Sequence, residues 1–245
     1  MLLRLAAGAA LASCQDSSRV PLSSGTPAPI LLYDGEGASG NDVAAIESIL
    51  NRTHLAYSTA DSRQWNDLSA ARLCEYRLLI LPGGNFMHMG QSLGPRAAAK
   101  IHDAVQAGSN YLGICAGGFL AGNVAEGGID LASGVQFQCY SAEQRGIRKA
   151  VLPITRVGAP ALEQYWEDGP QFSGFGEVVG RYPDGTPAIV EGHSGKGWVI
   201  LTGVHPEAPA EWRRGLNFTT PASVDNDYAA TLIDAALNRT RLPHE

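Results

Sequence analysis

The sequence has few cysteines, and their spacing excludes two common uses of this residue. Four cysteines occur in 245 residues, at positions 14, 74, 115 and 139, and none belongs to a C-x-x-C pair. Structural zinc sites and disulfide-rich secreted domains both rely on paired cysteines at short spacing. The sequence therefore predicts no metal site, no disulfide framework and no cofactor, and each cysteine needs its own explanation.

Positive charge and long apolar runs are also scarce. Lys and Arg number 18 against 24 Asp and Glu, a net charge of -6, and no basic stripe is present. A nucleic-acid partner is therefore not expected. Apart from a short leader, no apolar run approaches the ~20 residues that cross a bilayer as a helix. The 44% hydrophobic and 17% charged content nevertheless indicates a globular protein with a substantial core.

The first 29 residues differ in character from the rest. Arg4 precedes a short apolar run that ends in Ala12-Ser13-Cys14, and a linker rich in Ser, Pro and Gly follows. This pattern resembles a bacterial lipoprotein signal peptide, in which the cysteine becomes lipidated. We expect an exported protein anchored to the membrane through Cys14, periplasmic or at the cell surface. A disordered extension or a mis-chosen start codon are the alternatives, and an unprocessed leader would leave the protein cytoplasmic.

Residues 30–245 have the pattern of one α/β domain. Apolar runs predict strands at 30–33, 54–58, 77–81, 110–114 and 198–201, and helical periodicity predicts helices at 42–50, 95–107, from 116, and at 225–238. Alternating strands and helices imply a doubly wound, mostly parallel sheet with right-handed crossovers. Beyond about residue 134, turn signals between short runs predict appended antiparallel hairpins.

Cys115 lies where an apolar run meets two glycines, in Gly113-Ile114-Cys115-Ala116-Gly117. A nucleophile elbow is a sharp strand-to-helix turn that needs small residues two before and two after its central residue. Gly113 and Gly117 occupy those two positions. The geometry would expose the thiol at the end of a strand, and it would aim the N–H of Ala116 at an oxyanion. Cys115 is the candidate nucleophile, whereas Cys74 and Cys139 lack this context.

A thiol nucleophile needs a base, and His205 is the candidate. His205-Pro206-Glu207 follows an apolar strand, so both polar side chains are expected at the carboxyl edge of the sheet, where ligands of open α/β sheets bind. In an extended segment, residues two apart point the same way, so Glu207 could orient the imidazole. Among the other histidines, only His193 is kept as a fallback.

The glycines of Leu81-Pro82-Gly83-Gly84-Asn85 follow another buried strand. They would let a second backbone N–H face the same site, so Gly84 is predicted to complete an oxyanion hole with Ala116. An ordinary glycine-rich turn would have the same sequence.

The motifs ILPGGN, GICAGG and HPE, in this order, resemble those of the class I glutamine amidotransferase superfamily. Within it, YDGEGAS and the mid-chain YWEDGPQF look most like the amidotransferase-like N-terminal domain of biotin–protein ligases, and the likeness spans about residues 30–207. The resemblance implies a flavodoxin-like sheet and a triad of Cys115, His205 and Glu207. It also suggests Glu36, Ser39, Asn85 and Tyr165, with Trp166 beside it, as pocket residues.

The expected function is therefore a thiol-dependent hydrolase of an amide, resembling a glutaminase, amidase or peptidase. Its substrate would be a small molecule or a peptide. Because no Gly/Arg-rich adenylate loop is present, we expect no biotin ligase activity. We also expect no synthase partner domain. One alternative is a non-catalytic binding or scaffold protein that retains the fold. Another is a cysteine-dependent detoxifying or chaperone-like protein that uses a carboxylate near the first strand, such as Glu36, and does not need Glu207.

Overall fold

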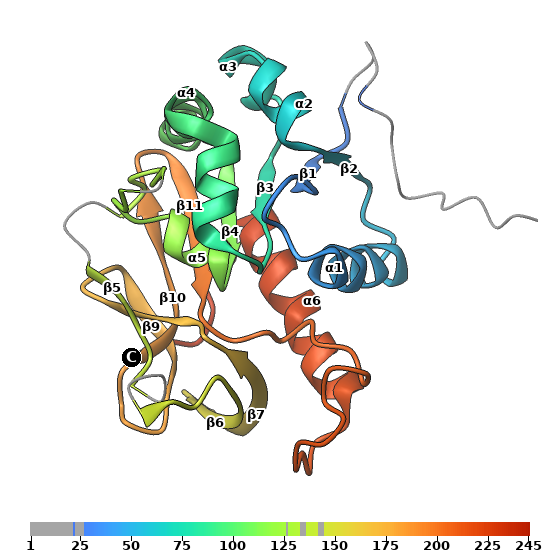
Figure 1. Cartoon of the computed structure of the whole chain (residues 1–245), viewed down its shortest axis with the longest axis vertical. Coiled ribbons are helices and arrows are strands. Elements are labelled where there is room, and N and C mark those ends of the chain that lie inside the picture. The colour runs from blue at the N-terminus through green and yellow to red at the C-terminus, as the bar shows by residue number, and fades with distance from the viewer. Residues whose placement is uncertain (1–21, 23–26, 126, 133–135, 142–144) are drawn as a thin grey trace, which may run out of the picture.

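The computed structural model in Figure 1 describes residues 22, 27–125, 127–132, 136–141 and 145–245. Cys14 and nearly all of the predicted leader lie outside the described residues, so lipidation and export stay predictions. Within the described part of the chain, no helix is both long and apolar enough to cross a bilayer.

A nine-stranded sheet forms the centre of the fold, with the order β2-β1-β3-β4-β11-β10-β9-β6-β7, and β5 pairs with β8 in a separate ribbon. The strands are β1 (Ile30–Tyr33), β2 (Tyr57–Ala60), β3 (Leu78–Leu81), β4 (Asn110–Ile114), β5 (Gln136–Cys139), β6 (Lys149–Arg156), β7 (Ala159–Glu167), β8 (Pro170–Ser173), β9 (Glu177–Arg181), β10 (Pro187–Ser194) and β11 (Gly197–Thr202). The first five strands in the order are parallel, and each remaining pair is antiparallel. This confirms the predicted α/β, doubly wound, flavodoxin-like sheet with appended hairpins.

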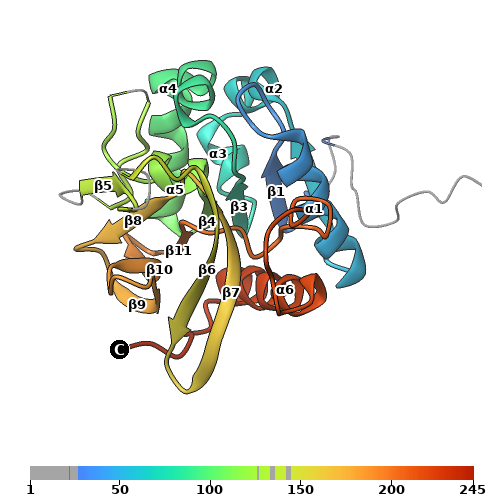
Figure 2. The same cartoon turned by 60° about the horizontal axis from the view of Figure 1, so that its bottom comes forward.

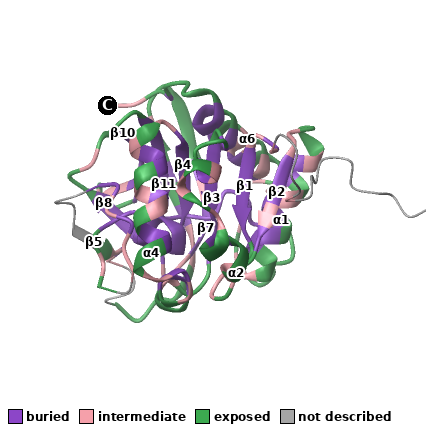
Figure 3. Cartoon of the chain, turned by 90° about the horizontal axis from the view of Figure 1, so that it is seen from above, coloured by how far each residue is buried: buried purple, intermediate pink, exposed green. Residues whose placement is uncertain are grey.

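Helices cover both faces of the parallel half of the sheet (Figure 2). They are α1 (Gly40–Arg52), α2 (Ser62–Asp67), α3 (Ala70–Leu73), α4 (Phe86–Ala107), α5 (Ala116–Leu120) and α6 (Ala222–Asn238). The apolar faces of α1 and α6 pack in one core cluster, and those of α2 to α5 pack in another. The protein therefore has three layers, with the sheet in the middle (Figure 3).

Strands of the parallel half such as β1 and β3 are continuous apolar runs in the sequence because helices cover both faces of the sheet. Ile30 and Leu32 of β1 point into the cluster under α1 and α6, while Leu31 and Tyr33 point into the other. Side chains alternate between the faces of a strand, so a strand that is buried on both faces needs apolar residues at every position.

Two boundaries differ from the predicted ones. The second strand begins at Tyr57, because the chain still turns at His54, where φ is 56°. The predicted helix from Pro95 is the second part of α4, which begins at Phe86 and is interrupted by Gly94 at φ 64° and ψ 171°. Proline is well placed at the start of the resumed helix because it needs no N–H donor there. The two short helices α2 and α3 were not predicted.

Candidate active site

A cavity of about 700 Å³ opens at the carboxyl end of the parallel strands. Residues that follow four strands line it: Ser39 after β1, Gly84 after β3, Cys115 after β4 and His205 after β11. Tyr165 of β7 closes the cavity from the antiparallel part of the sheet. The topology thus brings together segments that are far apart in the sequence.

The backbone at Cys115 has the strained geometry of an elbow, with φ 48° and ψ −102°. A Cβ on Gly113 would lie 2.6 Å from the carbonyl oxygen of Gly117, and one on Gly117 would lie 2.0 Å from that of Leu81. Both glycines are therefore needed for the turn to close. The thiol is 6% exposed, and Sγ lies 3.6 Å from the backbone oxygen of Glu167.

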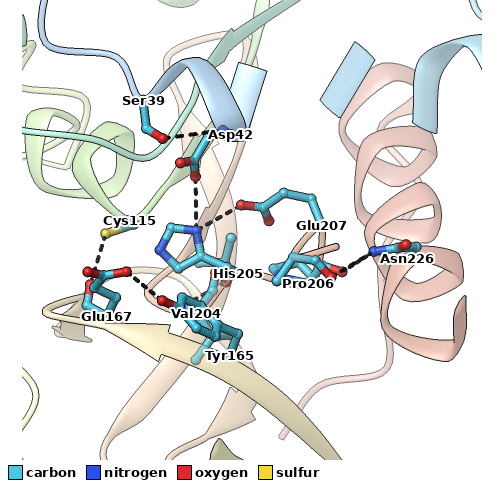
Figure 4. Close-up of polar contacts among 12 residues, drawn as sticks. Ser39, Asp42, Cys115, Tyr165, Glu167, Val204, His205, Pro206, Glu207 and Asn226 are labelled. Atoms are coloured by element: carbon cyan, nitrogen blue, oxygen red, sulfur yellow. Dashed lines mark hydrogen bonds and ion pairs between the residues drawn. The ribbon is translucent and has the colours of Figure 1, made fainter. Parts of the chain in front are cut away.

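The His205 ring is held by two carboxylates. Its Nδ1 lies 2.8 Å from Oε1 of Glu207 and 3.0 Å from Oδ1 of Asp42, at the start of α1. All three side chains are almost fully buried. Figure 4 shows the other ring nitrogen, Nε2, on the side of the ring that faces Cys115. The structure therefore brings His205 and Glu207 together, and it adds Asp42, which was not predicted as a site residue.

His205 and Glu207 meet for a different reason from the predicted one. The chain is not extended here but turns, with the N–H of Ala208 donating to the oxygen of His205 at 3.2 Å. The backbone N–H of His205 also donates to the oxygen of Tyr165 at 2.8 Å, which fixes the start of the turn against β7. The side chains of His205 and Glu207 converge because the backbone reverses between them.

The charges in this cluster set its protonation. Burial alone would lower the pKa of His205, but the charges of Glu207, Cys115 and Asp42 outweigh burial, and the pKa lies well above its ordinary value. Burial raises the pKa of Glu207, against the opposing effect of His205. For Asp42, burial is outweighed chiefly by the charge of His205, and the pKa is lowered. The arrangement favours an imidazolium beside an ionised Asp42.

Asp42, His205 and Glu207 are also close enough to hold a cation, since one ligand atom of each lies within 4.8 Å of the others. Both carboxylates, however, contact Nδ1 of His205, and a metal bound to that nitrogen would have to break these contacts. The donor set suits an oriented imidazole better than a metal, and the absence of a metal site stays a prediction.

The candidate oxyanion donors Gly84 and Ala116 both line the cavity. Gly84 has φ 147°, and a Cβ there would lie 2.2 Å from the oxygen of Gly37. Ser39 and Asn85 line the cavity as well, and each caps a helix: Ser39 accepts from Asp42 N at 3.4 Å, and Asn85 accepts from His88 N at 3.1 Å.

Three residues considered from the sequence do not line this cavity. Glu36 is exposed on a turn directed toward α2 and α4, where its N–H contacts the Ser62 hydroxyl at 2.8 Å. Trp166 points into the core on the opposite side of β7 from Tyr165 and donates to the oxygen of Gly169. His193 is exposed on β10 against Trp198. The carboxylate that reaches the site from the first strand is therefore Asp42 and not Glu36.

Apart from Tyr165, sequence reasoning missed the side of the cavity that faces the thiol. Tyr165 donates to Oε2 of Glu167 at 2.6 Å, Lys149 pairs with Oε1 of Glu167 at 3.0 Å, and Arg148 pairs with Asp168 at 3.4 Å. The β6–β7 hairpin carries these residues to the cavity, and its pairing with the rest of the sheet was not readable from local patterns. Cys139, which the sequence set aside as a core or surface thiol, lines the cavity too.

Trp212 covers another side of the cavity, 5.8 Å from the His205 ring. Its loop is held by the next residue: Arg213 pairs with the buried Asp225 at 3.3 Å, and Gln164 donates to Asp225 at 3.1 Å. Burial raises the pKa of Asp225 from 3.8 to about 7 despite the opposing charge of Arg213. Between pH 3.8 and about pH 7, Asp225 therefore binds a proton when the protein folds.

Because the folded pKa of Asp225 exceeds the unfolded one, its contribution to stability is full below about pH 4 and is lost as pH rises to about 7. We expect the free energy of unfolding, measured with urea at pH 5 and pH 8, to fall by up to about 3 kcal/mol more in the natural protein than in Asp225→Asn. Equal pH dependence of the two proteins would contradict this.

Comparisons with known proteins agree with the fold and the motifs. Residues 28–135 match the family model described as biotin-protein ligase, N terminal. A biotin–protein ligase from Schizosaccharomyces pombe is 28% identical over 219 residues, or 74% of this chain and 34% of the relative. The chain thus corresponds to about a third of that enzyme's length.

Solved glutamine amidotransferases have the same fold. One has a TM-score of 0.55 at 19% identity and covers 73% of this chain and 90% of its own. Another, from Thermotoga maritima, has a TM-score of 0.52 at 12% identity and covers 86% and 85%. The chain is therefore similar in sequence to the N-terminal domain of biotin–protein ligases, and it has the fold of these glutamine amidotransferases.

Proposed function

We propose that the protein is a thiol-dependent hydrolase that cleaves an amide with Cys115 as nucleophile and His205 as base. The observation that carries the proposal is the shared cavity: Cys115 and His205 line it together, and the far nitrogen of the imidazole is held by buried carboxylates. A binding protein has no need of a strained thiol opposite an oriented imidazole.

In the first half of the reaction, Nε2 of His205 takes the thiol proton and Sγ attacks the amide carbonyl carbon. The carbonyl π electrons move to oxygen, which the N–H groups of Ala116 and Gly84 stabilise. The C–N bond then breaks, and His205 returns the proton to the leaving nitrogen, which departs as ammonia or an amine. The acyl group stays on Cys115 as a thioester.

Water completes the cycle. His205 takes a proton from water as its oxygen attacks the thioester carbonyl, and a second tetrahedral intermediate forms at the same oxyanion donors. The C–S bond breaks, the carboxylic acid leaves, and the proton returns to the Cys115 sulfur. No redox step or cofactor is required by this sequence.

The cavity suits a polar amide. Tyr165, Glu167 and Lys149 form a hydrogen-bonded group opposite the thiol, while Phe119 and Trp212 provide apolar surface. Free glutamine, a small amide and a peptide-like bond all fit this chemistry, so the substrate class is decided by assay.

The test is release of ammonia or amine from a panel containing free glutamine, small carboxamides and short peptide amides. We expect at least one class to be hydrolysed by the natural protein, and Cys115→Ala to lose all turnover. Cys139→Ala is the matched control because it removes another thiol that lines the same cavity. Hydrolysis that survives in Cys115→Ala would refute Cys115 as the nucleophile. No hydrolysis of any class, together with intact ligand binding by that variant, would favour a non-catalytic protein.

A further inference from the structure

The imidazole of His205 has more carboxylate around it than one orienting residue supplies. Nδ1 carries at most one hydrogen, yet Glu207 and Asp42 both place an oxygen within 3.0 Å of it. The hydrogen bond goes to Glu207. Among the described residues, neither Oδ1 of Asp42 nor Oε2 of Glu207 has a hydrogen-bond partner, although both atoms are buried.

The fold holds the Asp42 carboxylate close to the His205 ring. Asp42 lies in the first turn of α1, where Ser39 accepts a hydrogen bond from its N–H. A Cβ on Gly83 would lie 2.3 Å from Oδ1 of Asp42 and 2.6 Å from Cε1 of His205. The first glycine of the LPGG motif therefore leaves the space in which this carboxylate reaches the ring, a role separate from the backbone N–H proposed for Gly84.

Two buried carboxylates at one imidazole repel each other unless protons neutralise them. The imidazolium neutralises one charge. The charge of His205 acts to lower the pKa of both carboxyl groups, against the effect of burial. Glu207 accepts the Nδ1 hydrogen, and Asp42 places a second carboxylate oxygen 3.0 Å from the same nitrogen.

We propose that Asp42 is a second positioning residue for His205, whose carboxylate stabilises the imidazolium in the Cys115–His205 pair together with that of Glu207. This inference rests on the proposed function for its role in turnover. It replaces a simple Cys-His-Glu triad with a thiol–imidazole pair held by two carboxylates.

The two carboxylates can be removed one at a time. Glutamine at 207 and asparagine at 42 each keep an oxygen that can accept from Nδ1, but each removes one ionisable group from the ring. Asp42→Asn therefore weakens the imidazolium even though Glu207 is intact, which a single Glu207 orienter would not give.

The test is the rate of Cys115 alkylation by iodoacetamide against pH, read by peptide mapping, which requires no substrate. The groups that face His205 and enter the profile are Asp42 from α1, Glu207 in its own turn, Cys115 at the elbow and Tyr165 from β7. We expect Asp42→Asn to move the profile to higher pH by about one unit or more, which is about tenfold in rate near neutral pH, and Glu207→Gln to move it in the same direction.

Asp227→Asn is the matched control, because Asp227 pairs with Arg52 at the other end of α1, 3.1 Å away, and is exposed. Thermal unfolding checks that each variant folds, and ¹⁵N NMR of the His205 ring, expected to lose imidazolium at lower pH in Asp42→Asn, gives a second readout. An Asp42→Asn profile that coincides with that of the natural protein overturns the inference. A shift in Asp42→Asn in a protein that hydrolyses no amide would support the pairing while refuting the hydrolase.

Discussion

His205→Gln is expected to lower kcat/KM for amide hydrolysis by about 10²- to 10⁴-fold or more, since a positioned general acid–base contributes at least this much. Without the imidazole, nothing in the cavity takes the thiol proton or returns it to the leaving nitrogen. The glutamine amide can still donate to Glu207, so the two carboxylates keep a partner. The measurement is steady-state kinetics on whichever amide class the panel identifies.

His193→Gln is the matched control, because His193 is exposed on β10 and does not line the cavity. It should leave kcat/KM within about twofold of the natural value. Activity of His205→Gln within a few fold of the natural protein, with an unchanged melting temperature, would show that the imidazole is not the base.

Gly117→Ala is expected to damage the elbow itself. The added Cβ would lie 2.0 Å from the backbone oxygen of Leu81, so either β3 or α5 must move. Overpacking against backbone costs at least about 3 kcal/mol, which lowers Tm by roughly 6 to 12 °C in a domain of this size. Because the thiol moves with the turn, hydrolysis should be lost even at temperatures where the variant is folded.

Gly40→Ala is the control for a methyl group without a clash, since a Cβ on this first residue of α1 meets nothing within 4 Å. It should change Tm by no more than about 2 °C. If Gly117→Ala were as stable and as active as Gly40→Ala, the tight turn around Cys115 would not be required for function.

The parallel half of the fold was predictable because each strand there is buried on both faces. Runs such as Leu78–Leu81 are apolar at every position, and glycine or proline marks where they end. For the antiparallel half, the sequence predicted hairpins but not the order in which they pair. Which hairpin lies beside which strand depends on pairing between distant segments, and β6 and β7 lie beyond β9 at the far edge although they precede it in the chain.

Some residues of the candidate site could likewise be predicted from local sequence, and others could not. Cys115, Gly113 and Gly117 could be found from the sequence because an elbow needs its small residues at fixed local spacing. Asp42 could not, because its local pattern is that of a helix first turn, and only the sheet topology brings it to the ring of His205. A local signal was available for α2, whose capping box joins Asp61 and Gln64.

The claim on which the account depends is that the sulfur of Cys115 and the imidazole of His205 work as a pair. The most direct measurement is labelling of the intact protein with an electrophilic glutamine analogue at neutral pH, with mass mapping of the modified cysteine. We predict at least tenfold faster labelling of Cys115 than of Cys74 or Cys139, and loss of that advantage in His205→Gln. Equal labelling of the three thiols, or an advantage of Cys115 that survives His205→Gln, would contradict the pairing.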